Sequence, residues 1–377
     1  MSQFHVALKR VVDDSYDIEI GRDLFALLRS DLKKGLGPKA NKYAILTDST
    51  VKKLYADKLL EDLKKEGLQV ELFTFPAGEK SKTRETKALL EDQMLEKGFG
   101  RDSCVIALGG GVVTDLAGFL AGTFNRGIPY INFATTLLAA ADASVGGKTA
   151  VDTPRATNLI GLFHQPLKVY IDVETWKTLP VREISSGLAE TIKHACIADA
   201  DFFTYLEKNM DKVISPSGQP VLDPEVLEHI AHKNCEVKYS VVVKDEKEAN
   251  LRQVLNLGHT AGRAIETLSG YSLLHGEALA IGLVVQVKLA KKMGLLSEDQ
   301  SKRVIQLLKR AGLHTKVPDT ITPKQLMDKL YTDKKVREGR VRFVLQDGIG
   351  QVKRFEDGSY STPLTEAVIL EAIQAAR

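Results

Sequence analysis

Between residues 40 and 180, short apolar runs alternate with longer segments whose apolar residues recur every three or four positions. The short runs are typical of buried strands, and the longer segments, which end at a glycine, are typical of amphipathic helices. This alternation predicts a parallel sheet with helices packed on it. The expected strands are 43–48, 70–75, 103–109, 130–134 and 168–172, and the alternating pattern at 1–20 predicts a further strand or hairpin.

The second half of the chain has a different pattern. After Pro180 the strand signal fades, and the apolar residues recur with helical spacing. We therefore expect an α/β domain over residues 1–184 and a mainly α-helical domain over residues 185–377. Residues 209–224 are rich in Pro, Gly, Ser and Asp and predict a surface loop between two helices.

Composition narrows the class of partner. The 52 basic and 49 acidic residues leave a net charge of +3, which gives no field of the kind that gathers nucleic acid, so we expect a small-molecule partner. No apolar stretch reaches about 18 residues, so no membrane span is expected. The three cysteines are far apart and form no CxxC pair, which predicts a chain without a disulfide framework and a cytoplasmic location.

Three consecutive glycines, Gly109 to Gly111, follow an expected strand and precede an expected helix. Glycine lets the backbone approach a pyrophosphate, and the free N–H groups of a helix start carry positive partial charge. The spacing is not GxGxxG, however, so a tight turn without a ligand is an equally good interpretation. Asp48 is likewise either a ligand contact or a helix N-cap. Glu79 and Lys82 lie in a charged turn, which is usually only solvated.

A second turn, within residues 135–153, places Asp142, two glycines and Lys148 in an otherwise small and apolar segment. A cation in such a run usually meets an anion or a dipole, because burying an unpaired charge is costly. Lys148 therefore either binds an anionic ligand or pairs with Asp142.

Three distant segments carry residues of the type that bind metals: Glu190, His259 and His275. Two histidines and a carboxylate form a recognised catalytic zinc set, in which one coordination position stays open for a substrate oxygen. Cobalt would fit the same ligands. His194, four residues after Glu190, would share its helix face and is the competing ligand. A buried histidine, a helix cap and a surface acid without any metal remain the structural alternative.

Eight segments occur in the order and at the spacing typical of one family, and together they cover most of the chain. The chain thereby resembles 3-dehydroquinate synthases, which are sugar phosphate cyclases. No single segment would suffice, but eight collinear ones are highly specific. The segments are GGGVVTDLAGF, FNRG, TTLLAAADASVGGKTAVDTP, NLIGLFHQP, LPVREISSGLAETIKHA, LRQVLNLGHTAGRAIE, LLHGEALAIG and DKKVREG.

The resemblance implies an N-terminal dinucleotide-binding α/β domain, a helical metal-binding domain and an active site in the cleft between them. It implies NAD and one divalent metal, zinc or cobalt, bound by Glu190, His259 and His275. The implied NAD site comprises Asp48, Glu79, Lys82, Gly110, Gly111, Val112, Asp115, Thr135, Thr136, Asp142, Lys148, Thr178 and Leu179. The implied substrate and catalytic residues are Arg126, Asp142, Lys148, Asn158, Lys193, Lys238, Arg252, Asn256, Arg263 and Lys334.

The implied reaction converts 3-deoxy-D-arabino-heptulosonate 7-phosphate into 3-dehydroquinate and phosphate. A hydride passes to NAD, phosphate is eliminated, the hydride returns, and the opened enol closes into a ring. Lysines and arginines would hold the substrate's carboxylate and phosphate. The resemblance also implies a homodimer and a place in the shikimate pathway, which leads to aromatic amino acids.

Three positions depart from the family's usual pattern. Thr157 stands where a lysine is usual, Arg263 where a histidine is usual, and Ala134 where a proline is usual. Arginine cannot act as a neutral proton acceptor near pH 7, but it can hold an anion. One hypothesis is compensation, in which Arg263 restores the positive charge that is missing at Thr157.

Three alternative functions remain open. The departures are compatible with a related cyclase that acts on sedoheptulose 7-phosphate or an amino analogue. A polyol dehydrogenase dependent on NAD and a metal would have a similar architecture. A non-catalytic binding protein would need neither the metal triad nor the two lysines Lys148 and Lys193.

Overall fold

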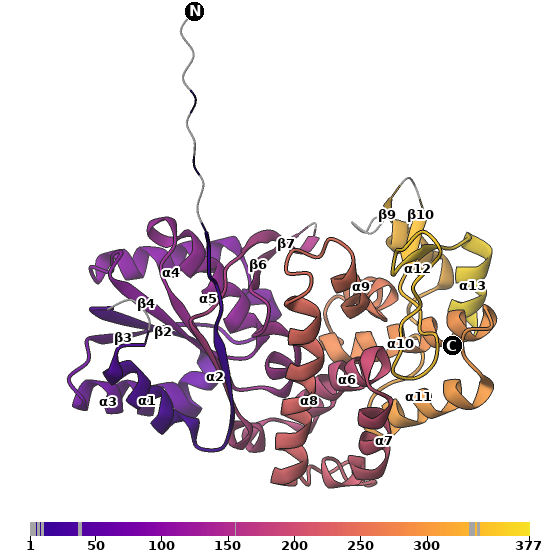
Figure 1. Ribbon diagram of the computed structural model, residues 1–377, viewed down its shortest axis with the longest axis horizontal. Coiled ribbons are helices and arrows are strands. Elements are labelled where there is room, and N and C mark those ends of the chain that lie inside the picture. Colours follow the sequence, from indigo (N-terminus) through magenta and orange to yellow (C-terminus); the bar gives the residue numbers. More distant parts are fainter. Residues whose placement is uncertain are drawn as a thin grey trace, which may run out of the picture.

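The computed structural model describes residues 5, 8, 11–36, 40–154, 156–331, 336–337 and 340–377. Its N-terminal half, drawn in indigo to magenta in Figure 1, contains a parallel sheet. This sheet has six strands in the order β1-β8-β5-β4-β2-β3. All five strands expected between residues 40 and 180 are present, and the N-terminal pattern supplies the sixth. The strands are β1 (Asp17–Gly21), β2 (Lys42–Asp48), β3 (Val70–Phe75), β4 (Ser103–Gly109), β5 (Tyr130–Ala134) and β8 (Lys168–Asp172).

Helices cover both faces of this sheet because its strands carry apolar side chains on both sides. In β2, Ala44 and Leu46 pack with Val113 and Leu116 of α5, whereas Ile45 belongs to a separate cluster on the opposite face. Helices α4 and α5 contribute to the first cluster, and α1 and α3 to the second. The helices of this half are α1 (Leu24–Lys34), α2 (Ser49–Val51), η1 (Lys52–Ala56), α3 (Asp57–Lys65), η2 (Glu79–Ser81), α4 (Arg84–Glu96), α5 (Gly111–Thr123) and η3 (Phe124–Arg126).

A short antiparallel hairpin was not expected from the sequence. It consists of β6 (Lys148–Thr153) and β7 (Ala156–Phe163) and follows η4 (Ala139–Ala143). A side chain at Gly161 would bring its Cβ within 1.9 Å of the Thr149 carbonyl oxygen, so the close approach of the two strands requires glycine there. The hairpin turns Lys148 toward the second half of the molecule, where its partner Glu248 lies.

The second half is mainly helical, as predicted, and adds one small sheet (Figure 1). Residues 213–223 form turns between α7 and α8, in agreement with the expected loop. The helices are η5 (Val173–Thr178), α6 (Val181–Ala198), α7 (Ala200–Asn209), η6 (Met210–Lys212), α8 (Pro224–Val242), η7 (Leu251–Asn256), α9 (His259–Leu268), α10 (His275–Lys292), α11 (Glu298–Arg310), α12 (Pro323–Tyr331) and α13 (Glu366–Gln374). The strands are β9 (Val336–Arg337), β10 (Arg340–Phe343) and β11 (Thr362–Pro363).

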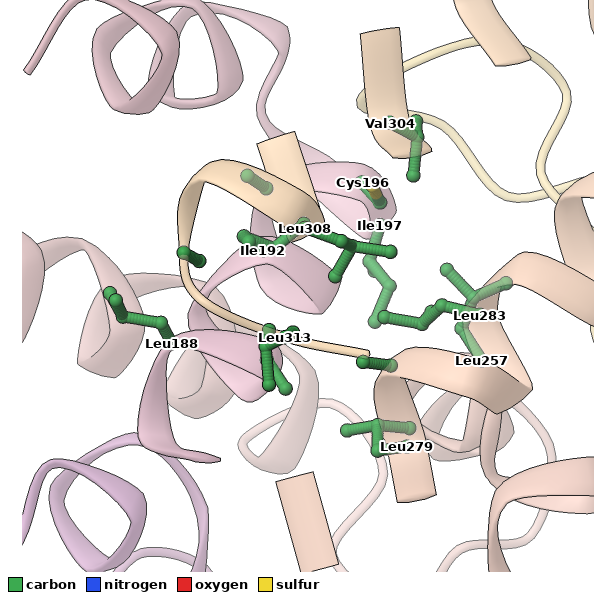
Figure 2. Packing of buried hydrophobic residues seen from close by; sticks show 14 of the residues in the cluster. Leu188, Ile192, Cys196, Ile197, Leu257, Leu279, Leu283, Val304, Leu308 and Leu313 are labelled. Atoms are coloured by element: carbon green, nitrogen blue, oxygen red, sulfur yellow. The ribbon is translucent and has the colours of Figure 1, made fainter. Parts of the chain in front are cut away.

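Helix α6 lies at the centre of this half. Figure 2 shows Leu188 and Ile192 of α6 among side chains of α10 and α11, including Leu283 and Leu308. Glycines bring the helices close together, since a Cβ at Gly276 of α10 would lie 1.9 Å from the carbonyl oxygen of a residue in α6. This packing fixes α6 against the start of α10, the two helices that carry Glu190 and His275.

Three further expectations concern the chain as a whole. The expected division at residues 184/185 falls within the first turns of α6, and it stays a prediction. Cys104, Cys196 and Cys235 are all buried and free. Among the described residues, no helix is long and apolar enough to span a membrane.

Candidate active site

The three expected metal ligands meet at one point. Glu190 comes from the middle of α6, and His259 and His275 are the first residues of α9 and α10. Glu190 Oε1 lies 3.4 Å from His259 Nε2 and 3.2 Å from His275 Nε2. One ligand atom from each residue lies within 4.8 Å of the others, a spacing that one cation can bridge.

The second nitrogen of each imidazole is also engaged. His259 Nδ1 donates to the carbonyl of Leu257 (3.3 Å), and His275 Nδ1 donates to Glu266 Oε2 (3.4 Å). These contacts hold the rings so that both Nε2 atoms face Glu190, an arrangement typical of histidines that bind a metal. Burial lowers the pKa of His259 to about 3, so this ligand is neutral.

The local field favours a cation. Although burial alone would lower it, the carboxylates of Glu266 and Glu190 raise the pKa of His275 to about 10. Glu190 Oε2 is paired with Lys193 Nζ, which leaves Oε1 facing the two imidazoles. Two imidazole nitrogens and one carboxylate oxygen therefore fit a divalent metal such as zinc or cobalt.

His194, the competing ligand, lies in a second possible group with Asp142 and Glu190. Asp142 is already paired there with Lys238, whose Nζ lies 2.6 Å from Asp142 Oδ1. Lys193 Nζ also forms an ion pair with Glu190. The Lys193–Glu190 pair is common to both groups, but Lys238 neutralises Asp142, which belongs only to the second. The second group is therefore the poorer cation site.

A cleft of about 560 Å³ adjoins the metal ligands, a volume that suits a small-molecule substrate. It lies between the β6–β7 hairpin of the first half and η7 and α9 of the second. His259 lines the cleft, and so does Asp115 from the N-terminal part of α5. Of the expected substrate residues, Asp142, Lys148, Asn158, Lys238, Arg252, Asn256 and Arg263 line it.

Two expected substrate residues within the described part of the chain, Lys193 and Arg126, do not line this cleft. Lys193 is fully buried beside Glu190. Arg126 lies just beyond the C-terminal end of α5, at the opposite end of that helix from the glycine turn. Lys334 falls outside the residues that the structure describes.

The cleft contains a buried arginine with unused donor capacity. The Arg252 side chain is 2% exposed, and its Nη2 donates to the Gly146 carbonyl (3.0 Å) while Nη1 donates to the Glu246 carbonyl. Its Nε has no hydrogen-bond partner. A fixed guanidinium with a free N–H at the wall of a cleft is suited to hold a carboxylate or phosphate.

Sequence reasoning missed one residue of this cleft, Glu248. Its carboxylate accepts a hydrogen bond from Asn256 Nδ2 (2.6 Å) and forms an ion pair with Lys148. Lys148 thus has a structural partner, but the partner is Glu248 and not Asp142. The segment DEKEAN resembles an exposed acidic loop, so only the left-handed φ of +60° at Glu248, which no sequence pattern predicts, distinguishes this acid from its neighbours.

The glycine turn lies between β4 and the N-terminus of α5. Gly110 is the N-cap, and a Cβ there would lie 3.1 Å from Thr136. A Cβ at Gly111 would lie 3.3 Å from Ala143. The hydroxyl of Thr135 is buried without a partner beside this turn. Tight glycines and a free helix N-terminus fit the pyrophosphate of NAD, as the family resemblance implies.

The other residues of the implied NAD site lie at the ends of helices in the first half of the chain. Asp48 caps α2, accepting from Thr50 N (2.7 Å) and Val51 N (2.9 Å), so its N-cap role is realised. The Thr178 hydroxyl is 2.6 Å from that of Tyr55, and Leu179 follows directly after η5. Val112 is the second residue of α5.

Lys82 is buried and not solvated, contrary to the usual state of a charged turn. Its side chain is 4% exposed, and Nζ lies 2.7 Å from Glu79 and 3.3 Å from Asp115. Burial raises the pKa of Asp115 to about 6, although Lys82 lowers it. The Lys82 ammonium links the turn after β3 to the second turn of α5.

Two family models match the chain: "3-dehydroquinate synthase N-terminal" over residues 72–186 and "3-dehydroquinate synthase C-terminal" over residues 187–336. The 3-dehydroquinate synthase of Desulforamulus reducens is 47% identical over 321 residues, which cover 85% of this chain and 88% of that protein. The enzyme of Pelobacter propionicus is 46% identical over 340 residues, or 90% of this chain and 92% of the relative.

Solved structures agree with this assignment. A 2-deoxy-scyllo-inosose synthase complexed with carbaglucose-6-phosphate, NAD+ and Co2+ is 27% identical, covers 96% of both chains and has a TM-score of 0.85. A 2-epi-5-epi-valiolone synthase from Streptomyces hygroscopicus with NAD+ and Zn2+ is 28% identical, covers 99% of both and has a TM-score of 0.85. A glycerol dehydrogenase from Schizosaccharomyces pombe, at 17% identity and a TM-score of 0.62, has the same fold. The chain belongs to the 3-dehydroquinate synthase family.

Proposed function

We propose that this protein is a 3-dehydroquinate synthase, a phosphate-eliminating carbon-oxygen lyase of the shikimate pathway. Its substrate is 3-deoxy-D-arabino-heptulosonate 7-phosphate, and its products are 3-dehydroquinate and phosphate. The observation that carries the proposal is the convergence of Glu190, His259 and His275 beside a cleft walled by cationic side chains. Relatives of 42–47% identity that bear this enzyme name support it.

Two groups would complete the site. Glu190, His259 and His275 would hold one divalent metal, and the turn at Gly110 and Gly111 would receive the pyrophosphate of NAD. When bound, the metal polarises hydroxyl oxygens of the substrate, and NAD reversibly accepts a hydride. The NAD+ and Co2+ or Zn2+ in the two related cyclase structures support this choice of cofactors.

The chain's own residues hold the substrate. Arg252 places a buried guanidinium charge at the wall of the cleft, and Lys148 supplies an ammonium from the start of the β6–β7 hairpin. Lys238 is fixed by Asp142, so its charge stays at a defined position in the cleft. Charge-assisted hydrogen bonds from these three cations would fix the carboxylate and phosphate throughout the reaction. Asn158 and Asn256 add neutral donors to the same walls.

Arg263 is proposed to bind an anion in place of the usual histidine. It lines the cleft beside His259, and its charge contributes to the lowered pKa of that histidine. A guanidinium at this position holds phosphate but takes up no proton near pH 7. Replacing Arg263 with alanine should therefore weaken binding of the phosphate-bearing substrate. Unchanged substrate affinity and turnover would contradict the compensation hypothesis for Thr157 and Arg263.

Three general properties belong to the same proposal. We expect domains at 1–184 and 185–377, and the junction of the two family models at residues 186/187 supports this division. We expect a homodimer, as the family resemblance implies. A cytoplasmic location is supported by three buried, unpaired cysteines.

The decisive experiment supplies the purified protein with the heptulosonate phosphate, NAD and zinc, and follows phosphate release together with absorbance of NADH. A synthase releases phosphate without net NADH, whereas a polyol dehydrogenase accumulates NADH in proportion to substrate. A non-catalytic binding protein would do neither. Parallel reactions with sedoheptulose 7-phosphate distinguish the related cyclases, since greater turnover of that sugar would contradict the proposed substrate.

A further inference from the structure

Tyr16 contacts the turn at Gly146 and Gly147, which directly precedes Lys148. It immediately precedes β1, at the edge of the sheet, and packs against the large apolar cluster of the helical half. Its hydroxyl oxygen accepts a hydrogen bond from the backbone N–H of Gly146 (2.9 Å). Tyr16 does not line the cleft, so it can affect a substrate only through the residues that it touches.

The turn that Tyr16 holds has little stiffness of its own. Gly146 and Gly147 are both buried and both have positive φ, +92° and +64°. Two adjacent glycines restrict the backbone less than any other pair of residues, so the turn depends on external contacts for a single conformation. Lys148 follows directly, so this turn sets the backbone position from which its side chain reaches Glu248.

The same glycine also fixes the buried arginine of the cleft. The Gly146 carbonyl accepts from Arg252 Nη2 (3.0 Å), on the opposite side of the residue from the Tyr16 contact. The fit is close, because a Cβ at Gly146 would lie 2.5 Å from Nη2 and 2.9 Å from Val242. One glycine residue therefore connects the Tyr16 hydroxyl to two cations, Lys148 and Arg252.

We propose that Tyr16 is a positioning residue, whose hydroxyl fixes Gly146 and thereby aligns Lys148 and Arg252 for an anionic substrate. This inference rests on the proposed function, which makes these two cations substrate ligands. Its physical basis is that phenylalanine would leave the buried Gly146 N–H without an acceptor, and the turn would shift to satisfy it. A shifted turn would weaken both cationic contacts together.

The test compares Tyr16→Phe with the wild-type enzyme in the phosphate-release assay. The KM for the heptulosonate phosphate should rise roughly fivefold to tenfold, the effect expected when one hydrogen bond near charged ligands is lost. The kcat should stay within about twofold, because the metal ligands are untouched. Tyr170→Phe is the matched control, since Tyr170 OH donates to Asp31 (2.7 Å) away from the cleft.

A second measurement does not depend on turnover. Hydrogen exchange of peptides that cover residues 142–150 should be faster in Tyr16→Phe and unchanged in Tyr170→Phe. An unchanged KM together with unchanged exchange would overturn the inference, and so would a loss of thermal stability alone. If the wild-type enzyme releases no phosphate, the proposed function fails, while the exchange comparison still tests the role of Tyr16.

Discussion

Replacing Glu248 with glutamine should tighten binding of anions in the cleft. The substitution keeps the size of the side chain and an oxygen that can accept from Asn256, but it removes the negative charge that engages Lys148. Since both partners are expected substrate ligands, the Glu248 carboxylate occupies a place where an anionic group of the substrate would otherwise bind. A substrate anion must therefore compete with it.

The magnitude follows from the distance and the exposure of the pair. Two opposite charges about 4 Å apart attract by about 4 kcal/mol at an effective dielectric constant of about 20, and a substrate anion competes with this attraction between Glu248 and Lys148. The Lys148 and Glu248 side chains are 45% and 28% exposed, so water and salt screen much of this interaction. A residual effect of about 1.4 kcal/mol would correspond to roughly tenfold tighter binding.

Calorimetric titration with inorganic phosphate at low ionic strength measures this effect directly. Glu246→Gln is the matched control, because Glu246 lies in the same loop but its carboxylate contacts Gln165 (2.8 Å) and Lys247 (3.0 Å) and not Lys148. In a Lys148→Met background the gain should be much smaller, since the competition is for Lys148. If phosphate affinity is equal or lower in Glu248→Gln, or if the gain persists fully without Lys148, then Glu248 does not compete with anions for Lys148.

Three further predictions concern the metal, the helix packing and acid stability. His275→Ala should lower the amount of bound zinc to well below one ion per chain and abolish phosphate release. If elemental analysis still finds one zinc ion per chain in this variant, His275 is not a metal ligand. Gly276→Ala should lower the free energy of unfolding, measured by urea denaturation, by about 3 kcal/mol, because its Cβ would lie 1.9 Å from the Ser186 carbonyl oxygen. Gly21→Ala is the control, since its Cβ would lie 3.6 Å from the nearest atom, and it should have little effect. Burial lowers the pKa of His194 to about 4. Between pH 6.5 and 4 this histidine therefore binds a proton in the unfolded chain but not in the folded chain. The free energy of unfolding should fall as the pH falls through that range. His194→Asn should reduce the loss of stability between pH 7 and 5, and an unchanged loss in urea titrations would contradict it.

The sequence alone predicted the elements that depend on local patterns. Strand β4 and helix α5 follow from a buried apolar run and a glycine turn, and both are present at the expected residues. Glu190, His259 and His275 could be proposed as ligands because metal chemistry restricts the residue types, although residue types alone left His194 open. Their convergence required the packing of α6, α9 and α10.

The environments of charged residues were harder to predict. Lys82 lies in a turn that resembles an exposed one, yet it is buried between Glu79 and Asp115. Lys148 was expected to meet either a ligand or Asp142, but its partner lies 100 residues further along the chain. Burial and pairing of a charge depend on which distant segments pack beside it, and no local pattern encodes that neighbour.

Local patterns in the sequence thus specify the α/β and helical halves, the family and the types of residue available for chemistry. The spacing of apolar residues shows which face of a helix or strand must be buried, and this spacing can be read within one segment. Long-range packing, in contrast, places Glu248 in the cleft, Arg126 at the far end of α5 and the Tyr16 hydroxyl on the turn at Gly146. These are contacts between residues distant in the chain, and their geometry is set by how the two halves pack together.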